Sequence, residues 1–338
     1  YKHQKEHALR SFGKTPRMME FFSLKTGRRY PWEKYAQTVV QDFIWGGEEN
    51  VSATTLADGT IHDSRAHLDF SSDNLVAHEL AHQWWGDLLT CRDWSHAWLN
   101  EGFATFFQNQ FTDYDLGHDN AAKETMDNQA SLRNTDVGDR RRPTVCRRFY
   151  GPNDLFDNRI YGKGSVVLNM LKDLLGEELF WKAINHYIDR FAFGSVETND
   201  FKIAIEEETG FNLEWFFEQW LYKAGYPEFD VSAAWSSTSR TLSLTVRQTQ
   251  RIDSLTALFT MPIDVELWVH GVPETHRVWI SRAEEVFPFA AYQEPELVLF
   301  DKGSKQMKKV TFQKPLDAWV YQLGHASEAV DRLLAIEE

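Results

Sequence analysis

Two histidines and a glutamate within the first hundred residues carry the strongest chemical signal in this sequence. The stretch V-A-H-E-L-A-H-Q-W-W-G-D, residues 76–87, places His78 and His82 four positions apart, with Glu79 directly after the first. On a helix such positions lie on one face, about one turn apart, so the two imidazoles can share one cation. Glu79 lies about 100° around the helix axis, beside that cation, where a carboxylate can take a proton from water.

A second glutamate supplies the third ligand that such a site needs. Eighteen residues, 83–100, separate His82 from Glu101 in the run W-L-N-E-G. An ionised carboxylate among apolar neighbours is costly unless it is paired or bound to a metal, and the neighbours here are Trp98, Leu99, Phe103, Phe106 and Phe107. Two histidines and a carboxylate with an open fourth position form a hydrolytic zinc site. The sequence therefore predicts one Zn²⁺ on His78, His82 and Glu101, and the open position argues against His96 as a further ligand.

Composition narrows the class of protein. The chain has 338 residues, of which 42% are apolar and 25% charged, as in an ordinary globular protein of two or more domains. Its formal net charge of −14 argues against a nucleic-acid partner. It contains no run of eighteen apolar residues, so we expect no membrane-spanning helix. The first residue is Tyr1 rather than Met, so we expect an excised piece of a longer protein, and the compartment stays open.

The pattern of apolar residues predicts an α+β protein in which helices precede strands. Gly225-Tyr226-Pro227 marks the change from helical periodicity to alternation. Helices are predicted within 1–35 and at 72–90, 97–111, 118–133, 163–175, 177–191, 199–208 and 213–221. Strands are predicted at 37–45, 242–246, 263–269, 277–280 and 296–300, with a hairpin turn at Asp58-Gly59. We expect a mainly helical domain over 1–225, an antiparallel β-sandwich over 226–312, and further helices over 313–338.

These motifs resemble those of the M1 zinc aminopeptidases, gluzincins with the pattern HExxH-x18-E. The family carries a Gly-x-Met-Glu-Asn motif on an edge strand, which is similar to G-G-E-E-N at residues 46–50. It also carries a tyrosine before Lys-Gly, and residues 161–164 are Y-G-K-G. The resemblance implies a thermolysin-like catalytic domain over 1–225, followed by the sandwich. It also implies a fragment that lacks the family's N-terminal domain and most of its C-terminal helical domain.

The resemblance also implies the roles of the remaining site residues. Glu79 would act as general base, and the Tyr161 hydroxyl would stabilise the oxyanion; without the resemblance, Tyr161 reads as a core tyrosine. Glu49 would bind the substrate's α-ammonium group, within a substrate-binding motif that includes Gly46, Gly47 and Asn50. The substrate would then be a peptide with a free N-terminus. Glu48 stands where the family has Met, and because adjacent strand residues point to opposite faces, we expect a solvated side chain.

Three alternatives to a zinc aminopeptidase stay open. One branch of the family also opens a lipid epoxide at the same zinc, and that reaction needs a long apolar channel. A non-catalytic relative that serves as a scaffold would purify without stoichiometric zinc. A purely structural zinc is disfavoured, because such sites are usually closed by four Cys or His ligands. The preferred N-terminal residue is not encoded in these motifs.

Overall fold

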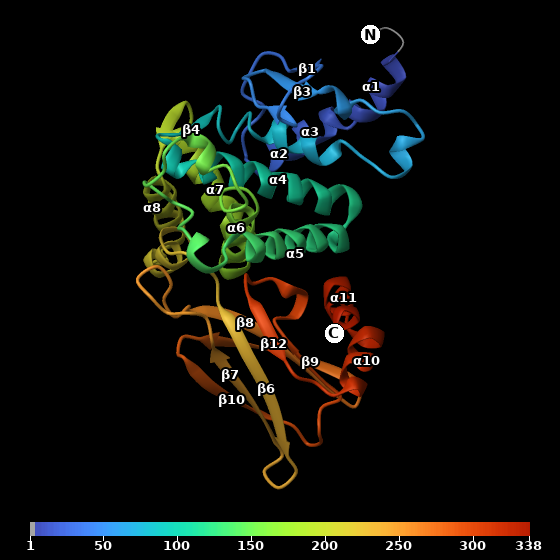
Figure 1. The fold of residues 1–338 in the computed structure, drawn as a ribbon, viewed down its shortest axis with the longest axis vertical. Helices are drawn as coiled ribbons and strands as arrows, with labels where there is room; N and C mark the ends of the chain where they lie inside the picture. Colours follow the sequence, from blue (N-terminus) through green and yellow to red (C-terminus); the bar gives the residue numbers. More distant parts are fainter. Residues whose placement is uncertain (1–3) are drawn as a thin grey trace. The chain divides into compact units, whose positions relative to one another are not determined.

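The structure of the chain is a computed structural model that describes residues 4–338 (Figure 1). These residues form two compact units, each made of two segments. The first unit combines the residues up to His118 with Val145–Leu213, and the second combines Asp119–Thr144 with Glu214–Glu338. The α+β class predicted from the sequence is confirmed, because helices and sheets occur largely in separate stretches. The predicted domains were continuous ranges, whereas the second unit recruits residues 119–144 from within the first of them.

The first unit is built around one long buried helix, α4 (Trp98–Leu116). Phe103, Phe106 and Phe107 of α4 are completely buried, and the helix packs against both α3 and α6. Large aromatic side chains supply much of the core, because each buries a large apolar area. The helices of this unit are α1 (Lys5–Phe12), α2 (Thr15–Lys25), α3 (Asp73–Ala81), α4, α6 (Gly162–Leu175), α7 (Glu177–Phe191) and α8 (Thr198–Thr209).

A three-stranded sheet precedes α3, in the order β1-β3-β2. Strand β3 (Ala53–Ala57) pairs in parallel with β1 (Ala36–Val40) and antiparallel with β2 (Gly47–Glu48), which is therefore an edge strand. The strand predicted at 37–45 is shorter than expected, because Asp42 adopts a left-handed conformation with φ 58°. The hairpin predicted at Asp58-Gly59 is wrong: Asp58–Thr60 form a 3₁₀ turn after β3.

The helix predicted at 72–90 ends early. The helix α3 stops at Ala81, and the next amide groups, of Gln83 and Trp84, bond to carbonyls three residues back instead of four. Gly86 has φ 134°, a conformation that a residue with a side chain rarely adopts, and it turns the chain toward β4 (Leu89–Cys91). This strand pairs in parallel with β5 (Gly194–Val196). His82 thus lies at the end of a helix rather than in the middle of one.

The second unit contains two facing sheets and several helices. One sheet has the order β10-β7-β6-β12 and the other β11-β8-β9. Phe229 of β6 and Phe300 of β11 meet at 5.5 Å between ring centroids, which joins the sheets through the core. The strands are β6 (Glu228–Ser236), β7 (Thr241–Gln248), β8 (Met261–Val269), β9 (Val272–Ile280), β10 (Glu284–Ala290), β11 (Leu297–Phe300) and β12 (Lys309–Phe312); the helices are α5 (His118–Thr135), α9 (Glu214–Phe217), a π-helix (Glu218–Tyr222), α10 (Leu316–His325) and α11 (Ala329–Glu337).

Three strands of the sandwich were missed in the sequence. The pattern over β7, β8, β9 and β11 was recognised, but β6, β10 and β12 were not predicted. Strand β10 contains Pro288, which is tolerated there because β10 lies at the edge of its sheet. Strand β12 is only four residues long, and it pairs in parallel with β6, unlike the other pairs of the sandwich. Such a pairing between distant segments leaves no local signal.

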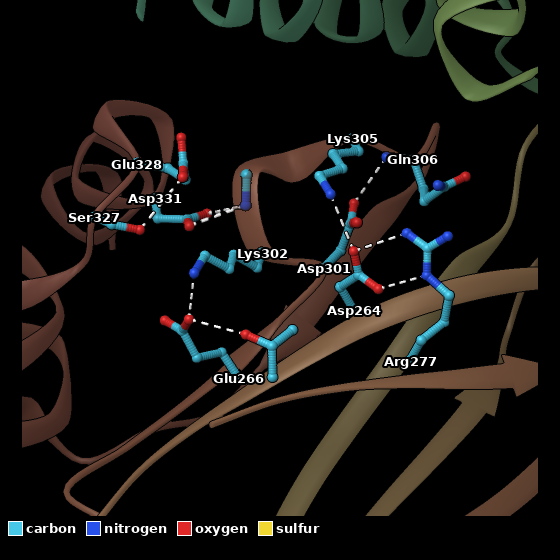
Figure 2. A network of polar contacts seen from close by, with 12 residues as sticks. Asp264, Glu266, Arg277, Asp301, Lys302, Lys305, Gln306, Ser327, Glu328 and Asp331 are labelled. Atoms are coloured by element: carbon cyan, nitrogen blue, oxygen red, sulfur yellow. Dashed lines mark hydrogen bonds and ion pairs between the residues drawn. The ribbon is translucent and has the colours of Figure 1, made fainter. Parts of the chain in front are cut away.

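A network of ion pairs crosses the second unit beside the sandwich (Figure 2). Asp264 in β8 accepts bonds from the Arg277 guanidinium, at 2.7 Å to Nε, and from Lys305 Nζ at 3.0 Å. Asp331 in α11 accepts the backbone N–H of Gly303 at 3.0 Å. These contacts join the loop after β11 to both a strand and the last helix.

Candidate active site

The structure brings the three predicted zinc ligands together. The Nε2 atoms of His78 and His82 are 3.2 Å apart, and Glu101 Oε2 lies 3.3 Å from the first and 3.2 Å from the second. Helix α3 supplies His78, the C-cap position directly after it supplies His82, and the first turn of α4 supplies Glu101. Packing of α3 against α4 therefore forms the group.

The geometry of this group fits a tetrahedral metal ion. Ligands at about 2.0–2.1 Å from zinc lie about 3.3–3.4 Å from one another along the edges of a tetrahedron, and the three separations found here are 3.2–3.3 Å. All three side chains are nearly or completely buried, with 12%, 1% and 8% of their surface exposed for His78, His82 and Glu101. The residues present therefore fit a zinc ion.

The protonation states of the ligands bear on metal binding. The backbone oxygen of Trp85 lies 2.8 Å from His82 Nδ1. Since a carbonyl oxygen only accepts, Nδ1 carries a proton, and Nε2 is the nitrogen left to coordinate. Although burial alone would lower it, the Glu49 and Glu101 carboxylates hold the pKa of His82 well above its ordinary value, so a metal ion would displace the proton from Nε2. Burial lowers the pKa of His78, which favours its neutral form. Although burial alone would raise it, the two histidines hold the pKa of Glu101 well below its ordinary value, so this ligand is ionised.

Glu79 lies beside the group without belonging to it. One carboxylate oxygen each of Glu79 and Glu49 and a ring nitrogen of His82 lie within 4.8 Å of one another. Burial, together with the neighbouring carboxylates Glu49 and Glu101, raises the pKa of Glu79 to about 8. A buried carboxylate with so high a proton affinity can accept a proton from a reacting group and return it.

The edge strand β2 contains Gly47 and Glu48 of the substrate-binding motif predicted at residues 46–50, and the other motif residues flank it. Glu49 Oε1 lies 4.0 Å from His82 Nδ1, the ring nitrogen that bonds to the Trp85 carbonyl, while His82 Nε2 meets the other two ligands. Glu48 is exposed, as expected for a residue that points to the other face of the strand. The Asn50 side chain is turned into the loop, where its Oδ1 accepts the Thr55 hydroxyl at 2.8 Å.

The two glycines of the motif differ in what surrounds them. A Cβ built on Gly47 would lie 2.2 Å from Glu79 Oε1, so any larger residue there would require the Glu79 side chain to shift. A Cβ on Gly46 would meet only Leu75, at an ordinary 3.4 Å. Gly47 thus allows β2 to approach the buried carboxylate, whereas Gly46 is under no such restriction.

Tyr161 is the N-cap residue of α6 and lies near the three ligands. Its ring stacks near His78, with 6.0 Å between centroids and 24° between planes. Burial, with the nearby Glu101 charge, raises the pKa of Tyr161 well above its usual range, so the hydroxyl keeps its proton and can donate. Gly102 and Gly164 let α4 and α6 touch, because a Cβ on Gly102 would be 2.9 Å from Gly164 Cα. This close crossing brings Tyr161 to Glu101.

His96 faces away from the ligands, toward a different acidic group. Asp93, His96 and Glu197 place one ligating atom each within 4.8 Å of one another. However, His96 Nδ1 accepts the backbone N–H of Thr198 at 3.2 Å, so the neutral ring carries its proton on Nε2, which lies 3.8 Å from Glu197. That nitrogen has no lone pair for a metal ion, and we assign none to this group.

One residue at the site was not singled out in the sequence. Gln83 is completely buried, and its side chain bonds to the backbone of residues 49–52. The signal that could have found it is its position, since it directly follows the ligand His82.

The fold and this buried His/His/Glu group are those of a metallopeptidase. The family model for the peptidase family M1 domain matches residues 10–220, and the chain belongs to that family. The resemblance seen in the motifs is thereby confirmed. Within the described residues, no helix is long and apolar enough to cross a membrane.

Curated relatives and a solved structure agree with this membership. Tricorn protease-interacting factor F2 of Thermoplasma volcanium is 35% identical over 231 residues, which are 64% of this chain and 28% of that protein. Aminopeptidase M1-C of Oryza sativa subsp. japonica is 32% identical over 208 residues, 60% of this chain and 24% of the relative. The leucyl aminopeptidase of Saccharolobus solfataricus is 27% identical over 286 residues, 80% of this chain and 34% of the relative.

The chain spans about a quarter to a third of the length of these relatives. Among solved structures, Legionella pneumophila aminopeptidase A in complex with aspartic acid superposes with a TM-score of 0.81 at 18% identity. The match covers 94% of this chain and 36% of that one. This likeness establishes a shared fold.

Proposed function

We propose that the protein is a zinc-dependent aminopeptidase that hydrolyses the N-terminal peptide bond of peptides. The observation that carries the proposal is the grouping of three kinds of residue in one buried place. A donor set with tetrahedral spacing, a buried carboxylate of raised pKa and a further carboxylate, that of Glu49, lie within a few ångströms of one another. The printed names of two relatives, both aminopeptidases, support the same reaction.

His78, His82 and Glu101 would hold the zinc ion. When bound, such an ion supplies Lewis acidity, which polarises the scissile carbonyl and makes water a nucleophile at neutral pH. The chain's own contribution is to bring the three ligands to tetrahedral spacing and to bury them. The bond from His82 Nδ1 to the Trp85 carbonyl fixes the orientation of that ring.

Glu79 would move the proton. It takes one proton from the attacking water and passes it to the nitrogen of the leaving amine, so that it ends the cycle as it began. Its position within a few ångströms of His82 and Glu49 supports this role. Tyr161, which keeps its phenolic proton, would donate a hydrogen bond to the oxygen of the carbonyl as negative charge develops there.

Glu49 would select substrates with a free N-terminus. Its carboxylate can pair with the α-ammonium group, and the cost of leaving a desolvated ammonium unpaired discriminates against other peptides. Gly46, Gly47 and Asn50 complete the binding motif. The edge strand β2 has one unpaired side, and an extended peptide can add there as a further strand.

The test is hydrolysis of amino-acid arylamides by the zinc-loaded protein, with N-acetylated arylamides beside them and Glu79→Gln as the blank. Cleavage of the free-amine compounds that is lost both on acetylation and in the blank is the expected result. Absence of cleavage in the presence of one zinc per chain would overturn the proposal and favour the epoxide-opening alternative. Absence of both cleavage and stoichiometric zinc would favour a scaffold.

A further inference from the structure

Gln83 occupies a position that the proposed reaction does not use. It follows the ligand His82 directly, it is 0% exposed, and it is neither a metal ligand nor a base. Buried amide side chains are costly unless their polar atoms are bonded. The partners of this amide therefore indicate what it does.

Three of the four partners of the Gln83 side chain lie within the substrate-binding motif or directly after it. Its Oε1 accepts the backbone N–H of Ser52 at 2.8 Å and the Tyr30 hydroxyl at 3.2 Å. Its Nε2 donates to the backbone oxygens of Glu49 and Asn50, at 3.2 and 3.4 Å. A backbone N–H only donates and a carbonyl only accepts, so these contacts fix which way the amide points.

The loop that Gln83 holds is strained. Ser52 has φ 60°, a left-handed conformation that is unfavourable for a residue with a Cβ. Such a conformation persists only where surrounding contacts enforce it. The bond from the Ser52 N–H to Gln83 is one such contact, and the bond from Ala36 N to the Ser52 oxygen, at 2.9 Å, is another.

The adjacent residues His82 and Gln83 thus lie next to the side-chain carboxylate and the backbone carbonyl of Glu49, respectively. His82 Nδ1 lies 4.0 Å from the Glu49 carboxylate, while Gln83 Nε2 bonds to the Glu49 carbonyl at 3.2 Å. The backbone of Gln83 is itself held, because Trp32 Nε1 donates to its oxygen at 3.2 Å. The distance between the ligand His82 and the Glu49 carboxylate is therefore determined by two links. These are the peptide bond between His82 and Gln83 and the bond from the Gln83 amide to the Glu49 carbonyl.

We propose that Gln83 is a positioning residue that fixes Glu49 relative to the metal centre and so sets the preference for substrates with a free amino group. The inference rests on the proposed aminopeptidase function. Loss of Gln83 would let the 49–52 loop relax from its strained form and would move the carboxylate, while the metal ligands and Glu79 stay in place.

The experiment compares Gln83→Glu and Gln83→Met with the wild-type zinc-loaded protein. Gln83→Glu keeps the length and the acceptor for Ser52 but turns a carboxylate toward the Glu49 and Asn50 carbonyls. Gln83→Met keeps the approximate volume and removes all four bonds. We expect KM for a free-amine arylamide to rise about tenfold or more, because both variants lose at least the two bonds to the Glu49 and Asn50 carbonyls, with kcat changed less than about threefold. The ratio of kcat/KM for free-amine over N-acetylated substrate should fall by a similar factor, at unchanged zinc content.

The matched control is Gln129→Met in the second unit. Gln129 is also buried, at 2% exposure, and its Nε2 donates to the Ser304 carbonyl at 2.9 Å. It should lower the melting temperature, as Gln83→Met does, without changing KM or the substrate ratio. If Gln83→Met fails to fold, Gln83→Glu alone carries the test.

The outcomes separate this inference from the function on which it rests. A wild-type protein that shows no preference for free amines overturns the proposed function. A wild-type protein with that preference, and Gln83 variants that keep both its KM and its substrate ratio, overturn the positioning role only. Loss of kcat and zinc together in the Gln83 variants would also overturn it, because that pattern indicates damage to the ligand helix.

Discussion

Gly47 and Glu79 are in contact at a point where any larger side chain would displace the Glu79 carboxylate. A Cβ added to Gly47 would lie 2.2 Å from Glu79 Oε1 and 2.3 Å from its carboxyl carbon. Glu79 is 5% exposed, so its side chain has little room to move away. The edge strand and the ligand helix are thus fitted together at the proposed general base, and a small change on the strand is transmitted to the proton-transfer group.

Gly47→Ala should therefore impair the proton-transfer step more than metal binding. We expect kcat to fall at least about 100-fold, because displacing a reacting group by about 1 Å has an effect of that order. The protein should still bind one zinc. Steady-state kinetics and zinc analysis on the same preparation measure both. Gly59→Ala is the matched control, since a Cβ there meets nothing within 4 Å and its activity should stay at the wild-type level. Wild-type kcat in Gly47→Ala would show that Glu79 is free to move.

Glu79→Gln should remove the proton-transfer group and leave the ligands intact. The expected loss of kcat is about 10²–10⁴-fold, the range typical of general acid–base catalysis. Zinc stoichiometry should not change, because Glu79 contributes none of the three ligand atoms at tetrahedral spacing. Retention of more than a tenth of the wild-type kcat would assign the base to another group.

Glu101→Gln should lose the metal. The substitution removes the ionised ligand, so zinc per chain measured after dialysis should fall well below one. A chelator should lower the melting temperature of the wild type and should have no such effect on the variant. Glu197→Gln is the control, because the group of Asp93, His96 and Glu197 has its ring proton on the nitrogen that would coordinate. Loss of zinc in Glu197→Gln rather than in Glu101→Gln would place the metal at Asp93, His96 and Glu197 and contradict the assignment of Glu101 as a ligand.

Asp264 should make the second unit sensitive to acid. Its bonds to Arg277 and Lys305 lower the pKa of this carboxyl from 3.8 to about 2 (Figure 2). The unfolded state binds the proton more tightly, so the contribution to stability is complete above about pH 4 and is lost as pH falls from about 4 to 2. Allowing for partial solvent screening, we expect about 1–2 kcal/mol.

Thermal unfolding of wild type and Asp264→Asn across pH 2–7 measures this contribution. The two melting temperatures should differ above pH 4 and converge near pH 2. Glu284→Gln, which breaks an exposed pair with Arg247, should have little effect at any pH, because surface ion pairs contribute little. A constant difference between wild type and Asp264→Asn down to pH 2 would contradict the assignment.

The sequence by itself determined the residue types that could form the site and most of the elements that carry them. The spacing of His78, His82 and Glu101 predicted their meeting, because helical periodicity is local and the apolar neighbours of Glu101 show that it is buried. The helices α4, α6, α7 and α8 and the longer alternating strands were predicted for the same reason.

Only the tertiary structure decided where α3 ends, which strands pair, and what surrounds each site residue. Ala81 ends the helix because Gly86 and β4 turn the chain toward a strand more than one hundred residues later. The contact of Gly47 with Glu79, the approach of Gly102 to Gly164 and the bonds of Gln83 to the 49–52 loop all join segments that lie far apart in the chain. Such contacts depend on the packing of whole elements, and packing leaves no periodic trace in the residues themselves.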